Sequence, residues 1–112
     1  MAGTDWDQIV GLYDLLLRVE PSPVIALNRA VAFGLSQGPR VGLTELDTVL
    51  RTGALDTYAL AHAARAEMLR KLGQTGAAQA SLRRALELTR QPAERRLLQR
   101  RLADVEQKGA GL

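Results

Sequence analysis

The chain has 112 residues, enough for one small domain with a modest core. It contains no cysteine, which excludes disulfides and thiolate metal sites and fits an intracellular protein. No apolar run approaches the roughly 20 residues of a membrane span, and the N-terminus lacks the pattern of a signal peptide. We therefore expect a cytoplasmic protein.

The composition favours helix, because Ala, Leu, Arg, Glu and Gln dominate while aromatic residues make up only 4%. The net charge is +3, but it is unevenly distributed. Residues 1–60 hold four basic and seven acidic side chains, whereas residues 61–112 hold eleven and five. The second half of the chain is therefore basic.

Turn signals divide the chain into six amphipathic helices with apolar residues at helical spacing. Gly38 and Gly73 are glycine stops. Residues 1–4 are interpreted as a start or linker scar, and 108–112 as a disordered tail. The single helical domain covers residues 5–107, with helices predicted over 5–20, 23–37, 39–52, 56–72, 75–89 and 92–107.

The helix boundaries rest on capping residues and prolines. Thr4 and Asp56 are the predicted N-caps of the first and fourth helices. Pro21 ends the first helix because proline cannot continue it. Ser22 followed by Pro23 then predicts a hydroxyl cap and a proline at the first position of the second helix.

A period near 35 residues links the helices into pairs, with Gly38 and Gly73 at that offset. Ala66, Ala78 and Ala85 are small residues spaced 12 and 7 apart, which resembles the tetratricopeptide repeat. The segment "HAARAEMLRKLGQTGAAQASLRRALELTRQP" carries this resemblance best. We expect an all-α fold of about six antiparallel helices in a short tetratricopeptide-like superhelical array, in which the first helix is the second half of an earlier unit.

Three longer blocks resemble one family more closely: "TDWDQIVGLYDLLLRVEPSPVIALNRAVAFG", "YALAHAARAEMLRKLG" and "ALELTRQPAERRLLQRRL". They resemble the C-terminal extension of bacterial extracytoplasmic-function (ECF) sigma factors that carry a tetratricopeptide-like tail. The block from Pro21 to Ala32 is the strongest marker, and the stretch from Ala93 to Leu102 supports it. The resemblance covers Thr4 to Val105, and the sigma domains themselves are absent from these 112 residues.

The resemblance implies a regulatory, protein-interacting domain excised from a factor that directs RNA polymerase in transcription initiation. Its partners would be the sigma domains of the same parent, the RNA polymerase core or another protein. DNA contact would come only through the missing sigma domains. The alternative is a stand-alone tetratricopeptide-like scaffold that binds peptides. The unpaired first helix could also drive homodimerisation of the isolated fragment.

Catalytic chemistry has no support in the residues. His62 is the only histidine, and a lone histidine without several nearby carboxylates does not make a metal site. The chain has no GxSxG elbow and no phosphate-cradling glycine loop. We expect no enzyme activity, no cofactor and no metal.

A basic docking surface is predicted on the sixth helix, formed by Arg95, Arg96, Arg100 and Arg101. If Leu97, Leu98, Leu102 and Val105 define its buried side, Arg96 and Arg100 point away from that side and Arg101 flanks it. Acidic residues on the same helix reduce its positive potential, so a solvent-exposed face or an acidic protein partner is favoured over nucleic acid.

Asn28 and Arg29 interrupt the apolar second helix and are candidates for an interaction site or a structural clamp. At 100° per residue, Asn28 falls between Val24, Val31 and Leu35, and a buried amide must be hydrogen-bonded. The structural interpretation is that its amide binds main chain at a helix end. The alternative is that Asn28 lines a groove that holds a peptide backbone.

Overall fold

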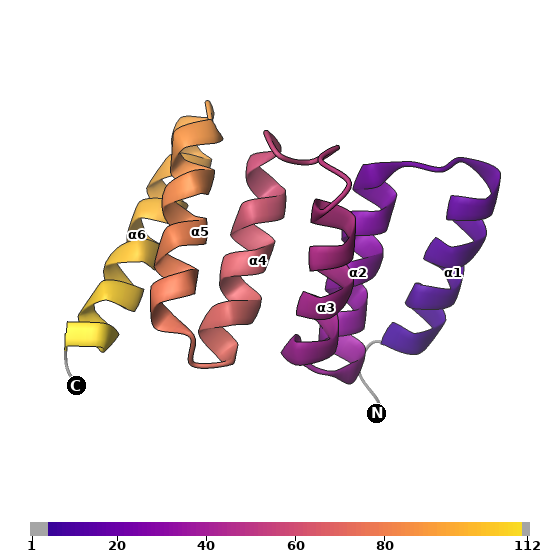
Figure 1. The fold of residues 1–112 in the computed structure, drawn as a ribbon, viewed down its shortest axis with the longest axis horizontal. Helices are drawn as coiled ribbons and strands as arrows, with labels where there is room; N and C mark the ends of the chain where they lie inside the picture. Colours follow the sequence, from indigo (N-terminus) through magenta and orange to yellow (C-terminus); the bar gives the residue numbers. More distant parts are fainter. Residues whose placement is uncertain (1–4, 111–112) are drawn as a thin grey trace. The chain divides into compact units, whose positions relative to one another are not determined.

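Six α-helices make up the regular secondary structure in the computed structural model, which describes residues 5–110 (Figure 1). No strand occurs in that part of the chain, so the all-α prediction is confirmed. None of these helices has the length and apolar character required to cross a membrane. The helices are α1 (Trp6–Val19), α2 (Pro23–Gln37), α3 (Pro39–Leu50), α4 (Ala59–Lys71), α5 (Thr75–Leu88) and α6 (Pro92–Ala110).

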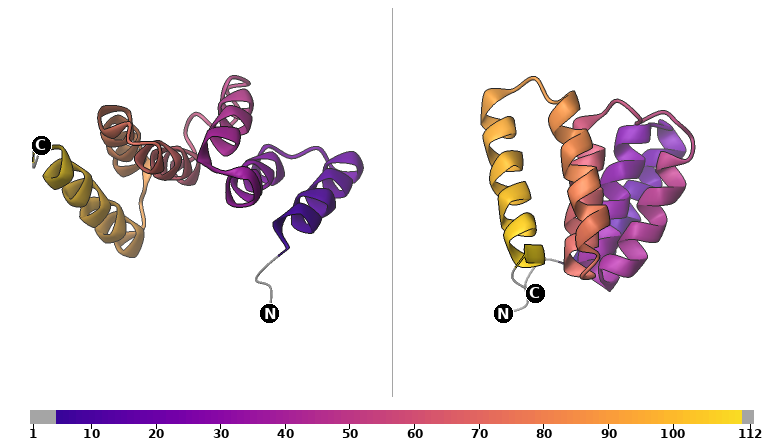
Figure 2. Two further views of the ribbon diagram at one scale, coloured as in Figure 1. Left: turned by 90° about the horizontal axis from the view of Figure 1, so that it is seen from below. Right: turned by 60° about the vertical axis from the view of Figure 1, so that its left-hand side comes forward.

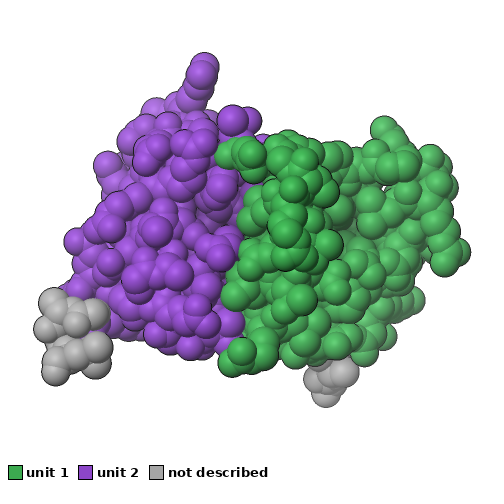
Figure 3. Space-filling view, in the orientation of Figure 1, with its two compact units in different colours: residues 1–56 green, residues 57–112 purple. Residues whose placement is uncertain are grey.

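The chain falls into two units, residues 1–56 with α1 to α3 and residues 57–112 with α4 to α6 (Figure 3). In the first unit, α2 packs against both α1 and α3. In the second unit, α5 packs against both α4 and α6. Figure 2 shows the same neighbours within each unit from two further directions. The middle helix of each unit therefore carries two packing faces.

The predicted start of α2 is confirmed. The Ser22 hydroxyl accepts a hydrogen bond from the Ile25 amide at 3.4 Å, and Pro23 occupies the first helical position. At α1 the cap is Asp5, whose carboxylate accepts from the Gln8 amide at 3.1 Å. The predicted cap, Thr4, lies outside the described residues.

The predicted start of the fourth helix at residue 56 is wrong. Residues 51–57 form turns, and α4 begins at Ala59 after Tyr58, which makes no side-chain cap. Leu55, within these turns, is buried. At the other end of the chain, α6 continues to Ala110, where a disordered tail was expected from residue 108.

Small side chains form much of the core between α4 and α5. Ala66, Ala78 and Ala85 are at most 2% exposed, which agrees with their predicted packing role. Alanines let helix backbones approach closely, and larger residues fill the remaining space. The buried apolar residues of the second unit are Ala61, Ala63, Ala66, Met68, Leu69, Ala78, Leu82, Ala85, Leu98 and Val105.

The core of the first unit uses fewer residues. Leu46 is fully buried, and Leu27 and Ala30 are at most 3% exposed. Its buried apolar residues are Val10, Leu27, Ala30, Ala32, Leu46 and Leu55. Since only Val10 comes from α1, the attachment of α1 relies on partly buried apolar side chains and on polar contacts.

Gly38 and Gly73 end helices with positive φ angles of 102° and 77°, as the two predicted glycine stops require. Residues other than glycine are sterically disfavoured in this region of the Ramachandran plot. A Cβ atom at Gly73 would meet nothing within 4 Å. The requirement for glycine there is therefore conformational and does not come from packing.

We predict that Gly73→Ala lowers the stability of the chain by about 1 kcal/mol. Gly76 is the matched control, because it is helical and a Cβ there also meets nothing within 4 Å. Gly76→Ala should leave stability unchanged or raise it by up to about 0.5 kcal/mol. Urea unfolding of both variants measures the difference, and equal effects would contradict the conformational explanation.

Candidate functional site

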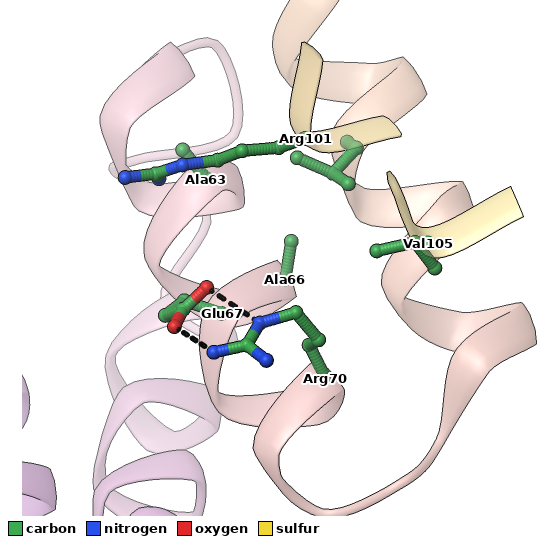
Figure 4. A pocket seen from close by; sticks show the side chains of 7 residues that line it. Ala63, Ala66, Glu67, Arg70, Arg101 and Val105 are labelled. Carbon is green, nitrogen blue, oxygen red and sulfur yellow. Dashed lines mark hydrogen bonds and ion pairs between the residues drawn. The ribbon is translucent and has the colours of Figure 1, made fainter. Parts of the chain in front are cut away.

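A shallow hollow lies in the second unit, where α4 and α6 both pack on α5 (Figure 4). Its volume is about 200 Å³, including the space open to solvent. Alanines from α4 and the side chains of Leu82 and Val105 supply apolar walls, and charged groups stand beside them. The lining residues are Ala63, Ala66, Glu67, Arg70, Leu82, Arg101 and Val105.

A forked ion pair stands at one edge of the hollow. Arg70 Nη2 donates to Glu67 Oε1 at 2.6 Å, and Arg70 Nε donates to Glu67 Oε2 at 3.1 Å. The two residues are three apart on α4 and therefore neighbours on its surface. This pair fixes the direction of both side chains at the rim.

The hydrogen bonds from Arg70 lower the pKa of the Glu67 carboxyl, although partial burial opposes that shift. The positive charges of Arg70, Arg101 and Lys71 lower this pKa further. The carboxylate in turn raises the pKa of Arg70. The rim therefore keeps a charged pair surrounded by additional positive charge.

Arg101 approaches the same hollow from α6, and Figure 4 shows its side chain reaching across the upper part. It is exposed, and its charge acts on Glu67. Of the four arginines in the predicted docking surface, Arg101 is the one that lines the hollow. The hollow thus places an exposed guanidinium beside an apolar wall.

Arg95 has a structural contact that the sequence interpretation did not include. Its Nη2 donates to the main-chain oxygens of Leu86 at 3.2 Å and Thr89 at 3.1 Å. These carbonyls lie at the C-terminal end of α5, where helical partners run out. Arg95 thus attaches α6 to the end of α5 and is already engaged.

Arg96 and Arg100 are exposed, and neither forms an ion pair with another residue in the range 5–110. Leu97, which was expected on the buried side of this helix, is 42% exposed and lies on the open surface. Leu98 and Val105 are buried as predicted. The open surface of α6 therefore combines two free guanidinium groups with one large apolar side chain.

Arg29 connects all three helices of the first unit. From α2, its Nε donates to Asp14 Oδ1 on α1, and its Nη1 donates to Glu45 Oε2 on α3 at 3.3 Å. The guanidinium carbon also lies 4.5 Å from the centre of the Phe33 ring. Arg29, which was predicted together with Asn28 as an interaction site or a structural clamp, thus has contacts within the first unit.

Asn28 is exposed, so the expectation that it is a buried amide is wrong. Its predicted neighbours Val24 and Leu35 are 39% and 46% exposed, which shows that this side of α2 faces outward. The apolar side predicted from a helical wheel is therefore not the side that packs. The groove interpretation of Asn28 stays a prediction.

Sequence reasoning did not identify the Glu67 and Arg70 pair or the hollow beside it. Their three-residue spacing was a usable signal for the pair, since opposite charges at that spacing meet on a helix. The two partners of Arg29 lie 15 and 16 positions away along the chain, and no local pattern marks them. In the described part of the chain, no group of three or more His, Cys, Asp or Glu residues is arranged to hold a metal ion.

The chain is similar to an uncharacterized protein of Rhizobium meliloti (strain 1021). It is 36% identical to this chain over 91 residues, which are 81% of this chain and 21% of the relative. The chain thus matches only about a fifth of the length of that protein. No family model matches the chain. No solved structure matches it either.

We predict that Arg29→Met lowers the stability of the first unit by about 1–2 kcal/mol, because two partly buried ion pairs and an aromatic contact are lost. The adjacent exposed residue supplies the matched control. Asn28→Ala should change stability by less than about 0.5 kcal/mol. Thermal unfolding measures both, and a larger loss for Asn28→Ala would restore a structural role for its amide.

We predict that Glu67→Gln weakens the second unit at neutral pH by about 0.3–0.5 kcal/mol, a typical value for a surface pair. The pKa of Glu67 is lower in the folded state than in the unfolded state. The wild-type chain should therefore be more stable than the variant at pH values above the ordinary carboxyl pKa of about 4.3. This difference in stability should disappear as the pH falls through the lower, folded-state pKa.

Stability measured from pH 7 down to pH 3 tests this dependence on Glu67. Glu87→Gln is the control, because Glu87 also pairs with an arginine three residues away but is 65% exposed. If the wild-type chain remains more stable than Glu67→Gln at low pH, Glu67 acts through packing and not through its charge.

Proposed function

We propose that this chain is a regulatory, protein-interacting domain of an ECF sigma factor, acting beside sigma domains that lie elsewhere in the parent protein. The sequence blocks that resemble this family support the proposal. The strongest of them, from Pro21 to Ala32, covers the turn and the first two thirds of α2, and another covers the first half of α6. Both blocks therefore fall on helices that also carry the arginine contacts described above.

We further propose that the helices form an antiparallel, tetratricopeptide-like array. The correspondence between α1 and α5 supports it. Both helices have 14 residues, and Trp6 and Thr75, where they begin, are 69 positions apart. The following helices begin at Pro23 and Pro92, which are also 69 apart. Two helix starts and one helix end thus repeat in register, as expected of two repeats of about 35 residues.

The open surface of α6 is the observation that carries the interaction role. Arg96 and Arg100 are four residues apart, exposed, and free of ion pairs within the described residues. Arginine forms forked hydrogen bonds with carboxylates, and Leu97 between them adds apolar contact area. This combination suits an acidic protein surface with an apolar spot.

Nucleic acid is a weaker candidate partner for this surface. Glu94, Asp104 and Glu106 lie on the same helix and dilute its positive field. Arg95 is engaged with α5, and Arg83 is 3.8 Å from Glu106. The number of arginines available for phosphate contacts is therefore small. DNA contact is assigned to the sigma domains of the parent.

The match to the Rhizobium relative is consistent with a domain that belongs to a longer protein, since it covers 21% of that relative. The alternative function, a peptide-binding scaffold, is favoured by the hollow between α4 and α6. Its apolar walls and the exposed Arg101 suit a shallow contact with a peptide that carries an acidic side chain. In that case binding would depend on Arg101 more than on Arg96 and Arg100.

We predict that the double variant Arg96→Glu and Arg100→Glu weakens binding of this chain to the sigma domains of its parent by at least about tenfold, because it reverses two charges at the contact. The stability of the chain should not change, since both side chains are exposed. Binding of purified sigma domains to the immobilised chain measures the affinity.

Arg101→Glu is the discriminating control in that experiment. Loss of binding in Arg101→Glu alone would favour the peptide groove over the surface of α6. If no sigma domain or RNA polymerase core binds the wild-type chain, the proposal of a sigma-factor domain is abandoned. The transcription output of the full-length factor with and without the double substitution gives a second measurement.

A further inference from the structure

The helix α1 has apolar residues on two opposite sides. Val10 is 8% exposed and belongs to the side that packs within the first unit. On the other side, Leu12, Leu15, Leu16 and Val19 are 56%, 54%, 49% and 85% exposed. Their spacing of three, one and three residues aligns them along one side of the helix. We call these four residues the α1 stripe.

The α1 stripe is different from the scattered apolar residues that most protein surfaces carry. It contains four of the eight large hydrophobic residues that are exposed in the described chain. The others are divided among three helices, at Val24, Leu35, Leu60 and Leu97. An uninterrupted apolar side on one helix is what a packing partner normally covers.

The second unit shows what covers the corresponding side of α5. The offset of 69 residues places Leu12 at Ser81 and Leu16 at Ala85. Ser81 is 6% exposed and Ala85 is fully buried. Arg65 on α4 donates a hydrogen bond from Nη1 to Ser81 Oγ at 3.1 Å, so this side of α5 faces α4. The helix directly before α5 therefore covers the positions that correspond to Leu12 and Leu16, while Arg84 and Leu88, which correspond to Leu15 and Val19, are exposed and half-buried.

The two outer helices of the chain are not alike. The exposed side of α6 carries Arg96, Arg100 and Asp104, with Leu97 as its one large exposed apolar residue in the described range. Repeat arrays end in helices with a polar outer side, which keep them soluble. By this criterion α6 has the character of a terminal helix, and α1 has that of an internal one.

We propose that the α1 stripe is the docking face of an amphipathic helix of the α4 type, which precedes α1 in the longer polypeptide. In the second unit, only the three residues 72–74 separate α4 from α5, so a preceding helix in the same polypeptide reaches this side through a short turn. The contact side of α4 carries small residues such as Ala63 and Ala66, and such a side can accommodate the larger Leu12 and Leu16.

This proposal rests on one part of the proposed function, namely that the chain belongs to a longer protein. It does not require the binding partner to be a sigma domain. It assigns the stripe to an internal contact of the parent and leaves the open surface of α6 for partners. A second copy of the chain is the competing occupant. The two occupants predict different behaviour for one substitution.

The test compares Leu16→Glu in the 112-residue chain and in a form extended by about 40 residues of the parent reading frame, about one further repeat. In the 112-residue chain, we expect little change in melting temperature because Leu16 is 49% exposed. In the extended form we expect a loss of several degrees, because the charge would be buried against the preceding helix. Hydrogen exchange in α1 should also be slower in the extended form.

Leu97→Glu is the matched control, since Leu97 is 42% exposed and should tolerate the charge in both forms.

Equal tolerance of Leu16→Glu in both forms overturns the proposal. A dimer of the 112-residue chain that Leu16→Glu converts to monomer, with no added effect in the extended form, assigns the stripe to a second copy instead. Translation that naturally starts at Met1 also overturns it. The sigma-domain binding experiment is independent of these outcomes.

Discussion

Each unit of this protein depends on one middle helix that packs on both of its sides. In the second unit α5 meets this requirement with small residues, since Ala78 and Ala85 are fully buried and let the neighbouring helices approach. In the first unit, fewer apolar side chains are fully buried around α2. Arg29 of α2 adds polar contacts to α1 and α3. With only three helices in a unit the apolar core is small, so these polar contacts make a larger relative contribution to its stability.

The positions of the helices could be predicted because their boundaries are local chemistry. Proline at the first position and the Ser22 hydroxyl act within one turn, and Gly73 is required by its own φ angle. The start of α4 could not be predicted in the same way. Asp56 is a residue type that favours helix caps, but the N-cap position is taken by Tyr58, which makes no side-chain cap. At the end of α6, Gly109 is typical of a helix stop, yet the helix continues through it to Ala110.

The candidate site was less predictable than the fold, and Asn28 and Arg29 show why. A helical wheel gives the angle between two side chains but not the side on which a neighbouring helix packs. Asn28 was grouped with apolar residues that turned out to face outward, while Arg29 points toward carboxylates from two other helices. Similarly, the arginines of α6 were predictable as a group, but only the fold separates Arg95, which binds α5, from Arg96 and Arg100.

The contact of Arg95 with the end of α5 affects how a partner of this protein should be mapped. Neutralising the arginines of α6 as a block would remove a helix-terminating contact together with the surface charge. The resulting loss of binding would then mix a loosened α6 with a missing recognition group. A scan that keeps Arg95 and alters Arg96 and Arg100 alone retains the two hydrogen bonds to Leu86 and Thr89. The effects of substitutions on this helix therefore report on recognition only when Arg95 is left unchanged.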